Sequence, residues 1–284
     1  MLKIDLHTHS NHSDGTDTPT ELMHQAQKAG LDIIALTDHD VTSGWEEAAQ
    51  AVPLTQVGLV RGTEISCAWH GITVHLLSYL QNPENVALKQ AHEHTIRSRQ
   101  GRAKEMVTRL GEDYPLTWED VLQQAPKTKL DGPIGRPHIA DALVAKGCFP
   151  TRSDCFETVL HPRSRYYVKH WSLDPIEAVE LVRAAGGVPV IAHPRARMRQ
   201  KLLPTKVILE MAKHGLAGLE VHHRDNSHAD REFLIEIADA YQLLITGSSD
   251  YHGTGKSNRL GENLTKPSVF EEIAQQGELE VLLP

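Results

Sequence analysis

Two histidines separated by one residue, His7 and His9, follow an apolar run that begins at Leu2. In an extended strand, residues i and i+2 point to the same face about 6.6 Å apart, so both imidazoles can reach one cation. Asp14, one short loop later, adds an oxygen ligand. Surface histidine pairs also occur by chance, so the meaning of this pattern depends on finding further ligand residues downstream.

Further histidines and carboxylates follow, or lie within, the apolar runs that we expect to form strands. With the first three residues they make a set of candidate ligands: His7, His9, Asp14, His39, Glu64, His75, His193, Asp250 and His252. So many nitrogen and oxygen donors exceed what one transition ion uses, which indicates a cluster of two or three divalent ions with a bridging carboxylate. Because no thiolate belongs to the set, we expect Mn, Zn or Fe in a catalytic site.

Each candidate also has an ordinary structural explanation when it is taken alone. His75 could be a hydrogen-bonded core histidine, His193 could be a loop residue before proline, and Glu64 could pair with Arg61. The recurrence of such residues at successive strand ends is far less expected by accident. We therefore interpret the set as one metal site.

The elements that must position these ligands alternate between strands and helices. The predicted strands start at Leu2, Ile33, Gly58, Ile72, Val188, Leu216 and Leu243. A capping box from Thr18 to Glu21 predicts a helix that ends before Gly30, and Ser43 and Glu46 are expected to cap the next helix. The candidate ligands lie at the C-terminal ends of at least four strands, which is the face where the active site of a β/α barrel assembles.

The middle of the chain has a different pattern. Helices are predicted over residues 91–110, 117–124, 137–146 and 151–160, with no strand before Tyr166-Tyr167-Val168. We therefore expect a barrel formed by residues 1–81 and 171–284 and an inserted helical subdomain at residues 82–170. The insert carries 14 basic and 11 acidic residues, against 15 and 26 in the rest of the chain. An anionic ligand is more easily held in the insert.

The composition is that of an ordinary globular protein, with 284 residues, 40% of them hydrophobic and 23% charged. No apolar run could span a bilayer, no secretory signal opens the chain, and the three cysteines form no Cys-x-x-Cys pair. We expect a cytoplasmic protein with reduced thiols and no membrane partner. The net charge of −8 argues against binding to duplex DNA. The oligomeric state is left open.

Ordered motifs surround the candidate ligands. They are His7-Thr8-His9 with Asp14-Gly15, Thr37-Asp38-His39-Asp40, Gly62-Thr63-Glu64, His75, Ala192-His193-Pro194 and Ser249-Asp250-Tyr251-His252. This ordered set resembles the motifs of the PHP (polymerase and histidinol phosphatase) superfamily. The resemblance implies an α/β fold, a distorted seven-stranded (β/α)7 barrel with a trinuclear metal site. It assigns to the three ions, in turn, His7, His9, Glu64 and Asp250; Glu64, His75 and His193; and Asp14, His39 and His252.

A closer resemblance is to the PHP phosphoesterases with an inserted helical domain, which include nucleoside 3′,5′-bisphosphate phosphatases and RNase AM-type 5′→3′ exonucleases. It rests on Arg99 and Arg102, on Gly135-Arg136-Pro137-His138-Ile139-Ala140, on Tyr167-Val168-Lys169-His170-Trp171 and on the stretch after Pro194. Many relatives have Gly-Arg-Tyr in that stretch, where this chain has Arg195-Ala196-Arg197. Which of these two arginines faces the substrate stays open.

The resemblance also implies which residues bind the substrate and which take part in catalysis. We expect Arg99, Arg102, Arg136 and His138 to bind substrate, because a guanidinium offers paired donors that match phosphate. Catalytic roles are expected for Arg136, His138, Arg195 or Arg197, and His223, the last as a candidate general acid. The alternative for Arg99, Arg102 and Arg136 is a solvated helix face.

The expected activity is that of a metal-dependent phosphoesterase, which hydrolyses a phosphate monoester or diester of nucleotides and releases phosphate. The preferred substrates are the 3′-phosphate of nucleoside 3′,5′-bisphosphates, short 5′-phosphorylated RNA degraded 5′→3′, or both. Alternatives are a small-molecule phosphatase of the histidinol-phosphate type, a non-catalytic metal-binding module, and a hydrolase of C–N bonds. The basic insert argues against the first of these alternatives, because a small ligand would not need it.

Overall fold

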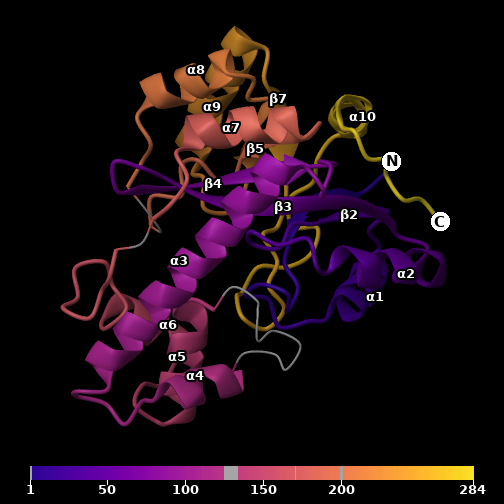
Figure 1. Ribbon diagram of the computed structural model, residues 1–284. Helices are drawn as coiled ribbons and strands as arrows, with labels where there is room; N and C mark the ends of the chain where they lie inside the picture. The colour runs from indigo at the N-terminus through magenta and orange to yellow at the C-terminus, as the bar shows by residue number, and fades with distance from the viewer. Residues whose placement is uncertain (1, 125–133, 170, 199–200) are drawn as a thin grey trace.

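Seven strands form one curved sheet in the order β1 to β7 in the computed structural model, which describes residues 2–124, 134–169, 171–198 and 201–284 (Figure 1). The strands are β1 (Ile4–Thr8), β2 (Ile33–Leu36), β3 (Gly58–Trp69), β4 (Ile72–Tyr79), β5 (Val188–Ile191), β6 (Gly218–His222) and β7 (Leu244–Gly247). The backbone N–H of His9 donates to the carbonyl of Tyr251 at 2.9 Å, which brings the two ends of the sheet together. The predicted distorted seven-stranded β/α barrel is confirmed.

The distortion comes from strand β4. Strands β1, β2 and β3 are parallel, as are β5, β6 and β7, but β4 is antiparallel to both β3 and β5. A turn with positive φ at His70 (46°) and Gly71 (80°) joins β3 to β4 as a hairpin. Positive φ at two central residues suits a two-residue hairpin because it matches the twist of the strands.

Helices cover the outside of the barrel. They are α1 (Pro19–Lys28), α2 (Trp45–Thr55), α7 (Pro175–Ala184), α8 (Thr205–Lys213), α9 (His228–Tyr241) and α10 (Pro267–Gln276). The capping box between Thr18 and Glu21 is present. The predicted cap of α2 is wrong: Gly44 precedes the helix without a side-chain cap, and the Ser43 hydroxyl lies 2.8 Å from Nδ1 of His12 instead. Helix α10 has no counterpart among the predicted elements.

A second group of helices is inserted in the chain after β4 and before β5, and it extends away from the barrel (Figure 1). It consists of α3 (Val86–Leu110), α4 (Trp118–Gln124), α5 (Arg136–Ala145) and α6 (Arg152–Glu157). Helix α3 begins earlier than predicted because the Asn85 side chain accepts a hydrogen bond from the N–H of Leu88 at 3.1 Å. The strand predicted at residues 166–168 is wrong. Tyr166 instead packs among these helices and donates its hydroxyl to Asp113 at 2.7 Å.

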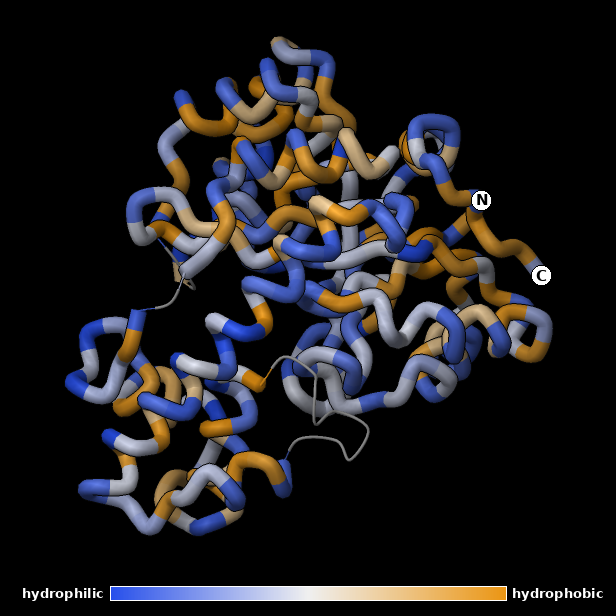
Figure 2. The backbone as a smooth tube through the Cα atoms, viewed as in Figure 1, coloured by the Kyte–Doolittle hydropathy of each residue, from blue (hydrophilic) through white to orange (hydrophobic). Residues whose placement is uncertain are grey.

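The hydrophobic core is divided in the same way. Three buried hydrophobic clusters surround the strands. One contains Ile4, the second contains Leu22 and the third contains Leu76. A further cluster, which includes Met106 and Leu143, joins α3 to α6 (Figure 2). The boundaries proposed for the helical subdomain stay a prediction. In the described part of the chain no helix is long and apolar enough to cross a membrane.

Candidate metal centre

The nine predicted ligands lie at one end of the barrel. His7 and His9 come from the end of β1, His39 follows β2, His193 follows β5, and Asp250 with His252 follows β7. Glu64 lies within β3 and His75 within β4, where antiparallel pairing places His75 opposite Ser66. The reversed direction of β4 therefore brings its first half to the same end of the barrel as the last residues of the parallel strands.

The first group of ligand atoms has the spacing of a tetrahedral site. His7 Nε2 lies 3.0 Å from His9 Nε2, 3.2 Å from Glu64 Oε2 and 3.5 Å from Asp250 Oδ1. His9 Nε2 lies 3.1 Å from the same Glu64 oxygen and 3.4 Å from the same Asp250 oxygen. The corners of a tetrahedron lie about 3.3 Å apart when each is about 2.0 Å from a central Zn²⁺. These four residues fit one ion.

The second group uses the other oxygen of the same carboxylate. Glu64 Oε1 lies 2.7 Å from His75 Nδ1 and 3.2 Å from His193 Nε2. Glu64 thus presents Oε2 to the first group and Oε1 to the second, which is the arrangement of a bridging carboxylate. Two ions that share a carboxylate are common in phosphatases and nucleases.

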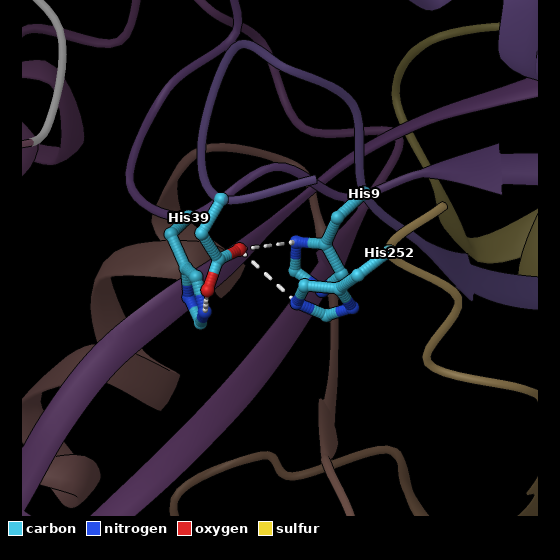
Figure 3. Close-up of side chains that lie close together, drawn as sticks. His9, His39 and His252 are labelled. Atoms are coloured by element: carbon cyan, nitrogen blue, oxygen red, sulfur yellow. Dashed lines mark ion pairs between the residues drawn. The ribbon is translucent and has the colours of Figure 1, made fainter. Parts of the chain in front are cut away.

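The third group contains Asp14, His39 and His252. Asp14 Oδ1 lies 3.0 Å from His252 Nε2, and Asp14 Oδ2 lies 3.9 Å from His39 Nε2. Figure 3 shows the rings of His9 and His252 side by side, with centroids 4.1 Å apart, and His39 across from them. One ligand atom from each of His9, Asp14, His39 and His252 lies within 4.8 Å of the other three, close enough to hold one ion.

The charges of the cluster are consistent with a bound cation. Burial alone would raise the pKa of Glu64, yet the imidazoles around it, led by His39, hold that pKa well below its usual range. Burial would lower the pKa of His9, but hydrogen bonds to Asp250 and Glu64 raise it to about 9. Without metal, protons on His7 and His9, whose pKa values are both raised, thus balance part of the carboxylate charge, and metal ions would take their place.

Unsatisfied polar atoms lie in the same place. Asp14 Oδ1, His39 Nδ1, His75 Nδ1 and His252 Nε2 are buried, and their short contacts to one another and to Glu64 do not have the geometry of hydrogen bonds. Buried polar atoms are nearly always hydrogen-bonded, so a group of exceptions is what a set of metal ligands would show. The donor set and its unsatisfied atoms both fit divalent metal ions.

Glu220 on β6 belongs to the site but is not among the predicted residues. It is fully buried, its Oε1 lies 2.9 Å from His7 Nδ1, and its Oε2 accepts the backbone N–H of His193 at 2.7 Å. Burial opposes its ionisation, but His7 and neighbouring histidines lower its pKa to about 2. A carboxylate on Nδ1 leaves Nε2 of His7 free for a metal ion. In the sequence, the signal that could have identified Glu220 is its position as the single acidic residue of an otherwise apolar predicted strand.

Two predicted ligands have strained backbones. His193 has φ 29° and Asp250 has φ 55°. Non-glycine residues in the left-handed region cost of order 1–3 kcal/mol each and gather at functional sites. The loop that carries Asp14 is fixed more conventionally, because Asp38 accepts the backbone N–H of Ser10 at 2.9 Å and the hydroxyl of Ser13 at 2.5 Å.

Three predicted substrate-binding arginines gather beside the metal centre. Arg136 lies with its guanidinium carbon 5.7 Å from the centre of the Tyr167 ring. Burial, together with repulsion from Arg136 and Arg99, lowers the pKa of Arg102 to about 9. Arg102 is 7% exposed and Arg99 has a side chain that is 16% exposed. A solvated helix face is therefore the wrong description of these side chains. Arg99 Nη1 is 3.1 Å from Asp40 Oδ2.

His138 is buried at the start of α5, where Nδ1 accepts the backbone N–H of Gly135 at 3.2 Å. It lines a cavity of about 230 Å³ that Asp14 also lines, together with the ion pair between Arg152 and Asp141. The structure therefore places His138 close to the third ligand group.

The other predicted catalytic residues are divided between two places. Arg195 Nε and Arg197 Nη2 lie 3.1 Å and 2.7 Å from Asp230 Oδ1. This pairing directs both guanidiniums to helix α9. His223 is fully buried, and its Nε2 lies 3.8 Å from Asp250 Oδ2, beside the metal centre. The roles of these residues stay predictions.

His170 of the predicted Tyr167–Trp171 motif lies outside the described residues. Glu64 does not pair with Arg61, whose guanidinium donates to the carbonyl of Glu280 at 3.1 Å. Lys256, which is not among the predicted residues, lies 3.0 Å from Asp250 Oδ2.

Comparison with known proteins gives four informative matches. A model of the PHP domain matches residues 5–131. The chain is 31% identical over 292 residues to the 3′,5′-nucleoside bisphosphate phosphatase of Chromobacterium violaceum, covering 100% of this chain and 99% of that protein. It is 32% identical over 267 residues to a 5′-3′ exoribonuclease of Haemophilus influenzae, covering 92% and 94%. A solved structure from Bifidobacterium adolescentis, provisionally assigned as a metal-dependent phosphoesterase, has 44% identity, a TM-score of 0.94 and coverage of 97% and 96%.

Proposed function

The chain belongs to the PHP domain family of metal-dependent phosphoesterases, and from that premise we propose that it releases the 3′-phosphate of nucleoside 3′,5′-bisphosphates. Short RNA with a 5′-phosphate is a second substrate of the same proposal, degraded 5′→3′. Relatives with these two activities match this chain along nearly its whole length. As a phosphoesterase the chain is a hydrolase, so a non-catalytic metal module is no longer an alternative.

The observation that carries the substrate assignment is the arginine cluster, which we define as Arg99, Arg102 and Arg136. Arg99 lies close enough to lower the pKa of both Arg102 and Arg136, and the Nε atoms of Arg99 and Arg102 are buried without a hydrogen bond to any described residue. A phosphate group supplies the charge and the acceptors that such donors lack. A substrate with a second phosphate explains the cluster better than histidinol phosphate does, because that molecule has only one.

The metal ligands are proposed in three groups. His7, His9, Glu64 and Asp250 hold one ion, Glu64, His75 and His193 a second, and Asp14, His39 and His252 a third. Bound Mn, Zn or Fe ions would neutralise phosphoryl oxygens and lower the pKa of water so that hydroxide forms near neutral pH.

The chain's own residues then position the substrate. Glu220 orients His7, and Asp38 fixes the loop that carries Asp14. The arginine cluster binds the phosphate that is not cleaved. His223, buried beside Asp250, is positioned to hold a proton for the leaving oxygen. Productive geometry of this kind supplies much of the rate enhancement in phosphoryl transfer.

The test compares phosphate release from adenosine 3′,5′-bisphosphate, a short 5′-phosphorylated RNA and histidinol phosphate, with Mn²⁺ supplied. We expect turnover of the bisphosphate, the RNA or both. Turnover of histidinol phosphate alone would refute the nucleotide assignment. Arg136→Ala should raise KM for the bisphosphate about tenfold or more, with little change for an aryl phosphate.

A matched control is available on the same insert. Arg97 lies on the exposed side of α3 and pairs with Glu93 at 3.5 Å, with its side chain 68% exposed. Arg97→Ala removes one positive charge without touching the cluster, so KM for the bisphosphate should stay within about twofold. Equal effects of the two substitutions would mean that only the overall charge of the insert matters.

A further inference from the structure

Asp40 directly follows the proposed ligand His39 and is fixed to strand β3. Its side chain is fully buried, and its backbone has φ 57°. The backbone N–H of Asp40 donates to the carbonyl of Glu64 at 3.2 Å, and Oδ1 accepts the backbone N–H of Ser66 at 2.8 Å. These contacts hold the Asp40 carboxylate in one place relative to the bridging residue Glu64.

The other oxygen of Asp40 reaches the insert. Asp40 Oδ2 lies 3.1 Å from Nη1 of Arg99, which belongs to helix α3. A guanidinium has five N–H donors, and the buried Nε–H of Arg99 makes no hydrogen bond to any described residue. Asp40 therefore fixes one part of the Arg99 fork and leaves at least one buried donor for another acceptor.

The charge around Arg99 indicates what that acceptor is. The arginine cluster has three positive charges, and Asp40 is the carboxylate that lies within ion-pair distance of it among the described residues. Repulsion from Arg136 and Arg99 acts on Arg102 even with Asp40 in place, because both lower its pKa. The remaining two positive charges match a phosphate monoester, which carries close to two negative charges at neutral pH.

We propose that Asp40 is a positioning residue for the substrate, which holds Arg99 so that its unpaired edge binds the phosphate that is not cleaved. This inference rests on the proposed function and adds a residue to it. Asp40 is not one of the proposed metal ligands and is not assigned a contact with the reacting phosphate, so it acts through Arg99. Because Asp40 contacts both Glu64 and Arg99, it would also fix the distance between the bridging carboxylate and the phosphate that Arg99 binds.

A simpler role for the same ion pair is to tether the insert to the barrel. A tether would contribute to stability and would affect all substrates alike. A positioning residue affects only substrates that carry the second phosphate. Asp40→Asn separates the two roles, since an asparagine keeps the size of the side chain and can still accept the N–H of Ser66 through its oxygen.

The experiment measures kcat and KM of the metal-loaded enzyme for adenosine 3′,5′-bisphosphate and for p-nitrophenyl phosphate, which has one phosphate. For Asp40→Asn we expect KM for the bisphosphate to rise about tenfold, with kcat and the KM for p-nitrophenyl phosphate within about twofold. Arg99→Ala should produce the same selective rise. Adding Asp40→Asn to Arg99→Ala should then cause no further change, because residues that act through one contact are not additive.

Glu93→Gln is the matched control, since it removes the carboxylate partner of Arg97 on the exposed side of α3. It should leave both KM values unchanged. Metal content, measured by mass spectrometry, should be equal in all variants. A loss of metal in Asp40→Asn, equal effects on both substrates, or additive effects with Arg99→Ala would each overturn the inference while the proposed function stands. If the wild type cleaves p-nitrophenyl phosphate but not the bisphosphate, the proposed function fails and the inference fails with it.

Discussion

The metal centre and the arginine cluster are neighbouring regions with opposite deficits. In the metal centre, each ligand group brings carboxylate and imidazole atoms within 4.8 Å of one another, a donor set for cations. In the arginine cluster, buried guanidinium groups repel one another, and Asp40 balances one of their three positive charges. Each region thus suits a ligand of opposite charge, the metal centre divalent ions and the arginine cluster a phosphate group. A bisphosphate bound to metal ions would engage both regions at once.

The largest effect is expected from the residue that joins two ligand groups. Glu64→Gln should remove the bridging charge, and kcat for any phosphoester should fall at least about 10³-fold with loss of bound metal. Phosphate release and metal content measured on the same sample check this. Full metal content together with near-normal activity would mean that Glu64 is not a bridging ligand.

Arg102→Met tests the opposite deficit in the arginine cluster. We expect KM for the bisphosphate to rise about thirtyfold, since a buried charge-assisted hydrogen bond contributes roughly 1.5–3 kcal/mol. Without ligand the same variant should melt at a higher temperature, because an apolar residue relieves repulsion between buried charges. Thermal melting with and without inorganic phosphate checks this. A lower melting temperature without phosphate would show that the cluster is not under electrostatic strain.

Glu220→Gln should have an intermediate effect. The variant keeps the shape of the side chain but holds the Nδ1 proton of His7 less strongly, so affinity for metal should fall about tenfold. Saturating Mn²⁺ should then restore most of the activity, unlike in Glu64→Gln. Titration of the metal-free protein measures this difference. An activity loss that excess metal does not reverse would place Glu220 among the ligands themselves.

The smallest effect concerns pH. His9 is protonated at neutral pH in the metal-free chain because its pKa is raised to about 9, and a metal ion requires the neutral imidazole. Binding of metal should therefore release at least one proton at pH 7. Metal affinity should rise by at least about tenfold per pH unit below pH 9, because His7 also has a raised pKa. Calorimetry in buffers of different ionisation enthalpy counts the protons, and a count of zero would contradict the raised pKa.

These two regions also differ in how far the sequence predicts them. The nine ligands lie at or near strand ends, so local motifs identify them. The barrel fold then brings these strand ends together, and no side-chain packing detail is needed to predict that they meet. Arg99 and Arg102 are also found by motif, but their burial depends on the rotation of α3, which begins at Val86 because Asn85 caps it. Aromatic residues near position 166 favour a strand by propensity, whereas packing among the insert helices overrides that preference.

Residues that support the site are harder to predict than those in it. Glu220 is a single acidic residue in a five-residue strand, and alternation alone permits it to face either the solvent or the barrel interior. Closure of the barrel decides between these faces, because it brings β6 next to His7 on β1. Asp40 is similar, since its partner Arg99 lies 59 positions later in the chain. Such long-range pairs require the fold itself.

The strained backbones of His193 and Asp250 have a consequence for directed evolution. Glycine at either position would relax a left-handed conformation and, by that criterion alone, improve folding. A library selected only for heat resistance or expression would therefore be drawn toward glycine at positions 193 and 250, and each such variant would lose a proposed ligand. Screens on this scaffold need an activity step in every round, or these two positions must be excluded from diversification.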